Sequence, residues 1–408
     1  MKQLFKRTAA LAVLVATGLA QAQQPTEIVV DYAFPDLFKE VHESIARDFM
    51  AKFPQYKVTF RAPTPDYEVA AQQVLRQAVT DQLPDVSYQG LNRLRVFADR
   101  GLAVDLTPFI KAEKGWAGMG YDQASLSLGQ VKGQQVGIGF ALGAPVIYYN
   151  ADLMRKAGVE PDRFPMNWDA IMNAAKKSKA ATPGTESLHV DWDISGNWMW
   201  QALVFSNGGT MLTADEKKVA FDGPAGKAAM LTLEKLVKQG EMRNISYSAA
   251  SQDFVSGKLA VLATSTARLG SITKQVGGKF EIRTARMPVA KDGRLPAGGN
   301  AAVMFSKDPA KQAAAWEYIK FATGPLGATT MVKATGNFPA NTLPATDPNL
   351  LAPFYKANPN HLTAIAQMPV LTGWYAFPGD NGLKITDVIK DHLQTVVSQE
   401  VQPAVALS

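Results

Sequence analysis

Two groups of aromatic residues are the first sign of a binding site in this sequence. They are Trp192, Trp198 and Trp200, and Trp374, Tyr375 and Phe377. Aromatic faces cover the apolar C–H surfaces of sugars and polyols, while acids, amides and hydroxyls bind their OH groups. Because Trp198, Ala202 and Phe205 share one face of a predicted helix, part of the first group is also expected in a core. We expect Trp198 or Trp200 to form a stacking wall for a hydroxylated ligand.

The sequence contains no catalytic or metal-binding signature. It has no cysteine, which excludes thiolate ligands, disulfides and cysteine nucleophiles. The four histidines have no metal-binding spacing, and neither H-E-x-x-H nor G-x-S-x-G occurs. His42 and His392 are expected to be solvated, because they fall on predicted helices rich in charge. We expect no metal and no cofactor.

Paired carboxylates leave one enzymatic alternative open. The pairs are Asp66 with Glu68, and Asp191 with Asp193. Glycoside hydrolysis needs two carboxyl groups about 5–10 Å apart, a separation that a sequence does not give. A secreted glycosidase is therefore kept as an alternative, and a structural periplasmic protein as another.

The glycine-rich run Gly137–Gly143 resembles a dinucleotide fingerprint but lacks its context. It has one residue too many before the last glycine, and a predicted strand at 146–149 follows it. A pyrophosphate needs a helix N-terminus at that point. The run is interpreted instead as a crossover where the backbone turns and packs closely.

Hydrophobic periodicity predicts the elements that position these residues. An apolar run at 28–30 is followed by Leu37, Val41, Ile45 and Phe49 at four-residue spacing, which predicts a strand and then a helix. Alternation of apolar and polar residues at 56–60 predicts a second strand. The strand–helix alternation resumes after residue 146 and predicts an α/β fold with mostly parallel sheets flanked by helices.

The N-terminus has the pattern of a secretory signal. Residues 1–22 combine three basic residues, a short apolar stretch and Ala20-Gln21-Ala22, a small-x-small cleavage pattern. The stretch is shorter than the roughly 20 residues that span a bilayer. The net charge is +6 for the whole chain and lower without this segment, with no basic run that would indicate a nucleic-acid partner. We expect a periplasmic protein.

Several segments in order along the chain carry a family resemblance. They are Pro145–Pro161 (PVIYYNADLMRKAGVEP), Asn167-Trp168-Asp169, Phe254–Val261, Gly298-Gly299-Asn300, Ala315–Phe321 and Thr335–Pro339. Together they resemble the family 1 extracellular solute-binding proteins of ABC importers, above all the members that bind glycerol-3-phosphate or sugars. The resemblance implies the two-lobe type II periplasmic binding protein fold, with a ligand cleft between the lobes. It implies a first lobe at 26–142 plus 267–338 and a second at 144–264 plus 340–408, with crossovers near Gly143, Ser265 and Pro339.

The resemblance also implies a set of ligand-binding positions. Those that it places at the cleft are Tyr67, Asn92, Gly143, Ser265, Thr266, Gly298, Gly299, Asn337 and Tyr375. Trp198, Trp200 and Arg268 complete the expected set because of the chemistry of their side chains. The arginine that holds phosphate in the glycerol-3-phosphate-binding members would fall at 375–378, where this chain has none. Arg268 or Lys384 remains as a substitute cation.

The expected ligand is therefore a sugar or sugar alcohol, delivered to a membrane-embedded ABC permease. The alternative is glycerol-3-phosphate or a glycerophosphodiester. The protein is expected to be a monomer with no nucleic-acid partner and no enzymatic activity.

Overall fold

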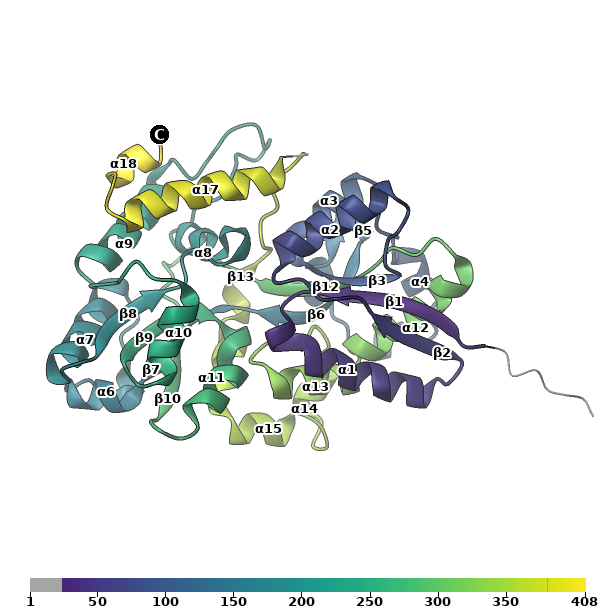
Figure 1. Cartoon of the computed structure of the whole chain (residues 1–408), viewed down its shortest axis with the longest axis horizontal. Coiled ribbons are helices and arrows are strands. Elements are labelled where there is room, and N and C mark those ends of the chain that lie inside the picture. Colours follow the sequence, from purple (N-terminus) through teal and green to yellow (C-terminus); the bar gives the residue numbers. More distant parts are fainter. Residues whose placement is uncertain (1–23, 380) are drawn as a thin grey trace, which may run out of the picture.

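The architecture consists of two lobes, each built around one β-sheet, in a computed structural model (Figure 1). The structure describes residues 24–379 and 381–408, so the predicted signal segment lies outside the described residues. The first sheet has the order β2 (Tyr56–Phe60), β1 (Thr26–Tyr32), β3 (Val86–Gly90), β12 (Gly298–Met304), β6 (Gly137–Gly143). The second has the order β10 (Ile282–Arg286), β7 (Pro145–Asn150), β9 (Leu259–Ser265), β8 (Glu186–Val190).

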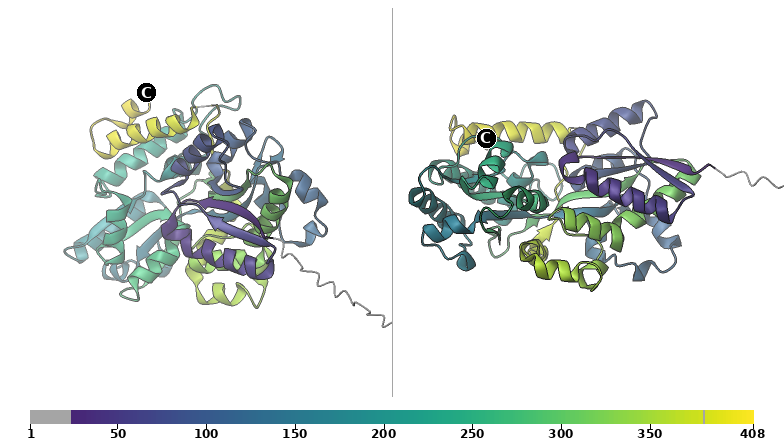
Figure 2. Two further views of the ribbon diagram at one scale, coloured as in Figure 1. Left: turned by 45° about the vertical axis from the view of Figure 1, so that its right-hand side comes forward. Right: turned by 60° about the horizontal axis from the view of Figure 1, so that its bottom comes forward.

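Helices cover both faces of each sheet (Figure 1, Figure 2). Those packed with the first sheet are α1 (Pro35–Lys52), α2 (Tyr67–Val79), α3 (Leu94–Asp99), α4 (Thr107–Ala112), α5 (Gln123–Ser127), α12 (Pro309–Thr323), α13 (Pro325–Ala334), α14 (Leu343–Thr346) and α15 (Ala352–Ala357). Those of the second lobe are α6 (Ala151–Lys156), α7 (Trp168–Ala181), α8 (Trp198–Ser206), α9 (Pro224–Lys238), α10 (Tyr247–Val255), α11 (Leu269–Val276), α16 (Leu362–Ala366), α17 (Gly382–Val397) and α18 (Pro403–Ala406). Among the described helices, none is long and apolar enough to cross a membrane.

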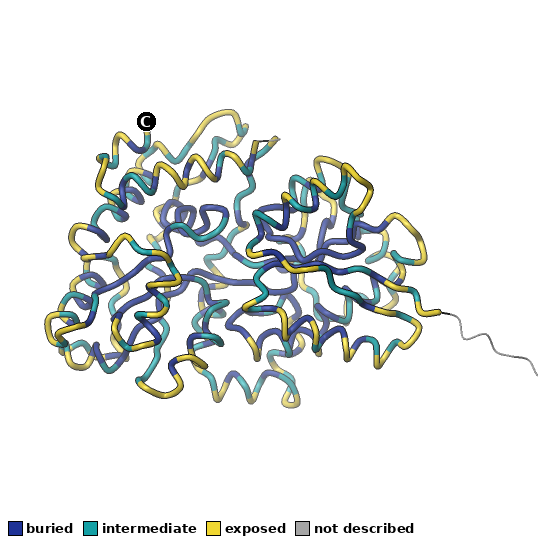
Figure 3. The backbone as a smooth tube through the Cα atoms, in the orientation of Figure 1, coloured by how far each residue is buried: buried dark blue, intermediate teal, exposed yellow. Residues whose placement is uncertain are grey.

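Local sequence explains where the helices near the cleft begin. Pro35 opens α1, because its fixed φ suits the first helical position and its missing N–H is not needed there. Asp66 caps α2 by accepting a hydrogen bond from the Val69 N–H at 2.8 Å. The strands β3, β6, β7 and β9 are buried almost throughout, dark blue in Figure 3, whereas the edge strands β2 and β10 are partly exposed. Two hydrophobic cores form in each lobe.

The α/β class with mostly parallel sheets is as expected, and each sheet contains one strand that runs against the others, β12 in the first and β7 in the second. β1 is parallel to β2 and β3, whereas β12 is antiparallel to both β3 and β6. In the second sheet β8 and β9 are parallel, and β7 is antiparallel to β9 and β10. The reason is the two-lobe connectivity. The chain leaves the first lobe along β6 and returns along β12, so two neighbouring strands at the same boundary must run in opposite directions.

Two segments lie in a different lobe from the one expected. α11 and β10 belong to the second lobe, because β10 pairs with β7 and Leu269, Ile272 and Val276 share a core with Tyr148. The segment containing α14 and α15 packs in the first lobe, where Leu351 is fully buried. The chain therefore crosses at Gly143, near Ala297 and between α15 and α16. Turn residues mark where a chain bends, but they do not tell which sheet the next strand will join.

His42 is buried, contrary to the expectation that it is solvated. It lies on the inner face of α1 with no exposed surface, and its ring stacks on Phe140 at a centroid distance of 5.1 Å. Neither ring nitrogen has a hydrogen-bond partner among the described residues. Burial therefore lowers the pKa of His42 to about 3.

Replacement of His42 by Phe should change the pH dependence of stability. In the unfolded chain His42 binds a proton below about pH 6.5, whereas in the folded chain its pKa is about 3. Between these pH values the unfolded state binds more protons than the folded state, so the unfolding free energy decreases as the pH falls. Relative to the native chain, His42→Phe should gain about 1.4 kcal/mol of unfolding free energy per pH unit from pH 6 to pH 4. Urea unfolding across this range measures the difference. Phe38→Leu, a core change without an ionisable group, should give a constant difference, and a constant difference for His42→Phe would contradict the assignment.

Candidate functional site

The candidate site is a cavity of about 60 Å³ between the lobes, here called the cleft. Its lining residues are Phe34, Leu37, Phe38, Tyr67, Ile194, Ser195, Trp198, Ser265, Ala267, Arg268, Gly298, Gly299, Asn337 and Trp374. Phe34 and Tyr67 follow the first two strands of one sheet, and Ser265 ends β9 of the other. Ligands of open α/β sheets bind outside the carboxyl ends of the strands, which is where this cavity lies.

An aromatic wall lines the cleft. Tyr67 makes edge contacts with Phe34 and Trp374 at centroid distances of 4.9 and 6.3 Å, and Trp374 lies 6.1 Å from Trp198. The polar groups of Trp198 and Tyr67 already have hydrogen-bond partners within the protein. Trp198 Nε1 donates to the Pro296 carbonyl at 3.1 Å, and the Tyr67 hydroxyl accepts from Asn300 at 3.0 Å. Burial also raises the pKa of Tyr67, which keeps the phenol neutral.

The segment that carries Trp374, which follows β13 (Leu371–Thr372), is held in place by α8. Gln201, fully buried on α8, accepts from the Tyr375 N–H at 2.9 Å and donates to the Tyr375 carbonyl at 3.2 Å. Trp374 Nε1 donates to the Gly196 carbonyl at 3.3 Å. The backbone of Tyr375 and the indole N–H of Trp374 are therefore both held, and the indole ring is positioned before any ligand arrives.

Polar groups meet at the floor of the cleft around the crossover at Gly143. A Cβ atom on Gly143 would lie 3.1 Å from Asn337 Oδ1 and 3.3 Å from Ser265 Oγ, so both groups approach the backbone closely. Asn337 Oδ1 is buried and has no hydrogen-bond partner among the described residues. Thr266 is already engaged, since its hydroxyl accepts from the Ala144 N–H at 3.1 Å. Asn337 is thus the floor residue with an acceptor left for a ligand.

Arg268 brings a positive charge to the cleft. Its Nη1 donates to Asp36 of α1 at 2.5 Å, across the boundary between the lobes. Burial works to lower the pKa of Arg268, but Tyr247 and Asp36 more than offset it and the pKa is raised. Arg268 is therefore charged and paired. Lys384, the other expected cation, is exposed on α17 and is not among the residues that line the cleft.

The expected site residues divide into three groups. Those that line the cleft are Tyr67, Trp198, Ser265, Arg268, Gly298, Gly299 and Asn337. Gly143 and Thr266 lie directly beneath it. Asn92, Trp200 and Tyr375 are outside it: Asn92 is buried against Gly196, and Tyr375 lines a neighbouring cavity.

Trp200 does not face the cleft. It is 2% exposed in the core of the second lobe and packs edge-on against Phe221. Two positions along a helix turn a side chain by about 200°, so Trp198 and Trp200 point to opposite sides of α8. The expectation for Trp200 is therefore corrected, and Trp198 alone of the two contributes to the wall.

Sequence reasoning missed half of the residues that line the cleft, namely Phe34, Leu37, Phe38, Ile194, Ser195, Ala267 and Trp374. Phe34 has a left-handed backbone with φ of 56° at the start of α1, an uncommon conformation for a bulky residue that no sequence pattern announces. Trp374 belongs to the second aromatic group in the sequence, but Tyr375 was the member of that group expected to bind the ligand. Asp36, which pairs with Arg268, carried no signal because the two are 232 positions apart.

The carboxylate pairs do not flank the cleft. Asp191 is buried and accepts from the Thr264 hydroxyl at 2.6 Å, and burial raises its pKa to about 7. Glu68 pairs with Arg93 and accepts from Ser195 at 2.8 Å. None of the residues that line the cleft is acidic. Among the described residues, no cluster of three or more His, Asp or Glu is arranged to hold a metal ion.

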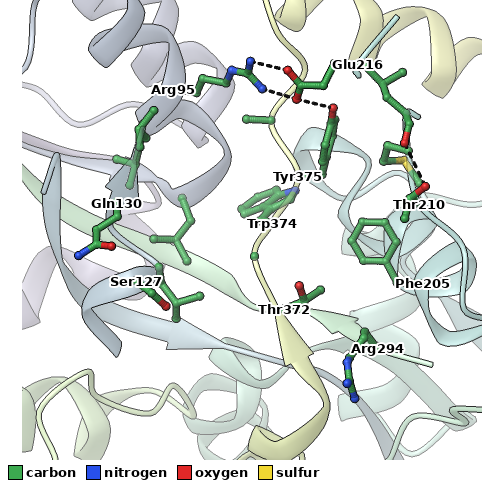
Figure 4. A pocket seen from close by; sticks show the side chains of 18 of the residues that line it. Arg95, Ser127, Gln130, Phe205, Thr210, Glu216, Arg294, Thr372, Trp374 and Tyr375 are labelled. Carbon is green, nitrogen blue, oxygen red and sulfur yellow. Dashed lines mark hydrogen bonds and ion pairs between the residues drawn. The ribbon is translucent and has the colours of Figure 1, made fainter. Parts of the chain in front are cut away.

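A wider cavity of about 820 Å³, here called the rear chamber, adjoins the cleft at Trp374, which lines both (Figure 4). Residues of both lobes line it. Arg95 of α3 donates two hydrogen bonds to Glu216 of the second lobe at 2.6 and 2.7 Å. The Tyr375 hydroxyl donates to the same carboxylate at 3.0 Å. These three residues, here called the clasp, connect the two lobes and the segment after β13 that carries Trp374.

Arg95→Ala should loosen the contact between the lobes. It removes two charge-assisted hydrogen bonds, but both partners are partly exposed, so the effect should be about 1 kcal/mol or less. This is up to about a fivefold change in the population of the closed arrangement. Small-angle scattering should therefore show a more extended particle. Lys57→Ala is the control, since Lys57 pairs with Glu27 within one lobe on an exposed surface. Identical profiles for Arg95→Ala and the native chain would show that the clasp does not hold the lobes together.

Gly298→Ala should displace the Trp198 ring. A Cβ atom at this position would lie 2.6 Å from Trp198 Cζ2, far inside contact distance. Overpacking of this kind costs about 1–3 kcal/mol, and the indole should also lose its hydrogen bond to Pro296. Denaturant unfolding and tryptophan emission measure both effects. Gly118→Ala, where a Cβ meets nothing within 4 Å, should change neither; a native-like emission spectrum for Gly298→Ala would contradict this geometry.

The comparisons with known proteins agree with this geometry. Residues 44–363 match the family described as bacterial extracellular solute-binding protein. The sn-glycerol-3-phosphate-binding periplasmic protein UgpB of Escherichia coli (strain K12) is 25% identical over 436 residues, covering 100% of this chain and 95% of that protein.

Two solved structures share the fold. UgpB from Mycobacterium tuberculosis in complex with glycerophosphocholine has a TM-score of 0.81 at 20% identity, covering 94% of this chain and 96% of that one. The cyclic alpha-maltosyl-1,6-maltose binding protein from Arthrobacter globiformis has a TM-score of 0.74 at 23% identity, with the same coverage. The expected two-lobe periplasmic binding protein fold is therefore confirmed, and the chain belongs to the bacterial extracellular solute-binding protein family.

Proposed function

We propose that this chain is the solute-binding component of an ABC importer and captures a sugar or polyol between its lobes. The observation that supports this most strongly is the composition of the cleft. Its walls are the aromatic rings of Phe34, Tyr67, Trp198 and Trp374, and its cation Arg268 is already paired with Asp36. Such a surface suits an uncharged solute with apolar C–H faces and several hydroxyl groups.

The cleft offers such a ligand both stacking and hydrogen bonds. Trp198 and Trp374 are fixed by backbone acceptors, so their faces are available without rearrangement. Asn337 Oδ1 can accept from a hydroxyl, and Ser265 can donate to one. A site built to hydrogen-bond hydroxyl groups rejects analogues that lack them, because its own buried polar groups are then left unpaired. The cavity of about 60 Å³ favours a small solute when the lobes are in contact.

Several features support binding without catalysis. Hydrolysis of a glycoside needs two carboxyl groups on either side of the bond, and the cleft lining has none. The carboxylates nearby are engaged by Arg268, Arg93 and Thr264. We infer that the solute is released unchanged to a membrane-embedded permease. We also infer that residues 1–22 direct export to the periplasm, where the chain acts as a monomer.

Glycerol-3-phosphate or a glycerophosphodiester is the second candidate. Arg268 lines the cleft, and a guanidinium holds phosphate well through paired hydrogen bonds. UgpB of Escherichia coli, at 25% identity, is named for sn-glycerol-3-phosphate, and the Mycobacterium tuberculosis protein binds glycerophosphocholine. The neutral ligand is preferred because a phosphate would have to compete with Asp36 for Arg268.

Calorimetry against a panel of neutral sugars, polyols and glycerol-3-phosphate tests this function. A neutral member should bind, and at a hundredfold excess over Kd it should raise the unfolding free energy by about 2.7 kcal/mol. Solution scattering with this ligand should show a more compact particle than without it. Tight binding with an unchanged scattering profile would contradict the two-lobe capture mechanism. Turnover of chromogenic glycosides would instead establish the glycosidase alternative.

A further inference from the structure

The environment of Arg268 combines groups from both lobes. The rings of Phe34 and Tyr247 lie 5.8 and 5.1 Å from its guanidinium carbon, one from each lobe. The side chain of Arg268 is 18% exposed, whereas that of Asp36 is 59% exposed. A nearly buried cation is thus neutralised by a carboxylate that reaches it from the solvent side of α1.

We propose that Asp36 occupies the place of an anionic ligand group, so that Arg268 forms a masked anion site in the cleft. While Asp36 accepts from Nη1, an incoming phosphate must either displace it or bring a second negative charge beside it. Both are unfavourable, because displacement of Asp36 gives up its ion pair with Arg268, and a second anion beside the same cation is repelled by the Asp36 carboxylate. Asp36 is therefore a specificity-determining residue that selects neutral over phosphorylated solutes. This inference rests on the proposed function only in naming the neutral solute as the preferred one.

No other carboxylate takes over this role among the described residues. Asp191 is close enough for Arg268 to affect it, but its hydrogen bond comes from Thr264 and not from the guanidinium. Burial dominates its environment and raises its pKa to about 7. Without the Asp36 charge, Arg268 keeps its two aromatic neighbours but loses its ion pair. Such an arginine offers a free, partly buried fork of donors at the edge of the cleft.

Asp36→Asn is the test, with sn-glycerol-3-phosphate as the probe in calorimetry at low salt. The amide keeps the shape of the side chain and removes the charge. Binding should become tighter than in the native chain by roughly tenfold or more, because a charge-assisted contact to phosphate becomes available. The gain should disappear in the double variant Asp36→Asn with Arg268→Ala, and it should shrink as salt is added.

Glu43→Gln is the matched control. It removes one negative charge from the same helix, but Glu43 pairs with Lys39 at 2.5 Å on an exposed surface away from the cleft. Its affinity for the probe should stay near the native value. Asp36→Ser also removes the charge, so it should bind the probe more tightly than the native chain does. Agreement between the two variants would show that the effect comes from loss of the charge and not from the asparagine amide. Thermal unfolding of each variant verifies that it is folded.

Two results would overturn the proposal. One is an affinity of Asp36→Asn for the probe no greater than that of Glu43→Gln. The other is a native chain that already binds the probe as tightly as Asp36→Asn does, with loss of binding in Arg268→Ala. The proposed function fails separately. If no neutral sugar or polyol binds but Asp36→Asn gains phosphate binding through Arg268, the masked anion site stands and the ligand class is wrong.

Discussion

The passage of the backbone between the lobes at glycine residues is the constraint on which the cleft depends. Gly143 of β6 lies opposite Gly298 of β12 in the sheet register, where the chain leaves the first lobe and returns to it. Gly299 has φ of 101°, and a Cβ atom there would lie 1.8 Å from the Ala141 carbonyl oxygen. A side chain at any of these positions would push the strands apart or fill the floor of the cleft. The absence of Cβ atoms lets Trp198, Asn337 and Ser265 converge over bare backbone.

The aromatic wall built over this floor is organised before a ligand arrives. Its rings come from segments distant in the chain, and those of Tyr67, Trp198 and Trp374 are fixed through their polar atoms. Gln201 also holds the backbone of Tyr375, next to Trp374. Buried hydrogen bonds of this kind determine one ring orientation, since any other would leave a donor unpaired. A wall that does not have to be ordered on binding spares the ligand part of the entropy cost of association.

Two ion pairs at the boundary between the lobes each join a residue of one lobe to a residue of the other. Asp36 and Arg268, like Arg95 and Glu216, contribute one partner from each side. These pairs therefore form only when the lobes are in contact, so closure and charge compensation are coupled. Because Arg268, the cation in the cleft lining, is paired with Asp36, its charge is compensated before a ligand arrives. This electrostatic arrangement, together with the aromatic wall, is the basis for proposing a neutral solute.

The sequence by itself determined the α/β class, the family and half of the residues that line the cleft. These depend on local signals: hydrophobic periods, helix starts such as Pro35, and short segments such as Pro145–Pro161 whose order along the chain resembles the family. Local signals also indicated Trp198 and Gly143, because an aromatic group on a predicted helix and a glycine-rich run can each be recognised from a few neighbouring residues.

Only the tertiary structure decided which side of each element faces the cleft and which distant residues meet there. It buried Trp200 and His42, joined β10 to the second sheet, and brought Asp36 to Arg268 from 232 positions away. The physical reason is that burial and ion pairing depend on how whole elements pack. A period of 3.6 residues shows that a helix has an inner face, but the neighbouring sheet determines which residues lie on it.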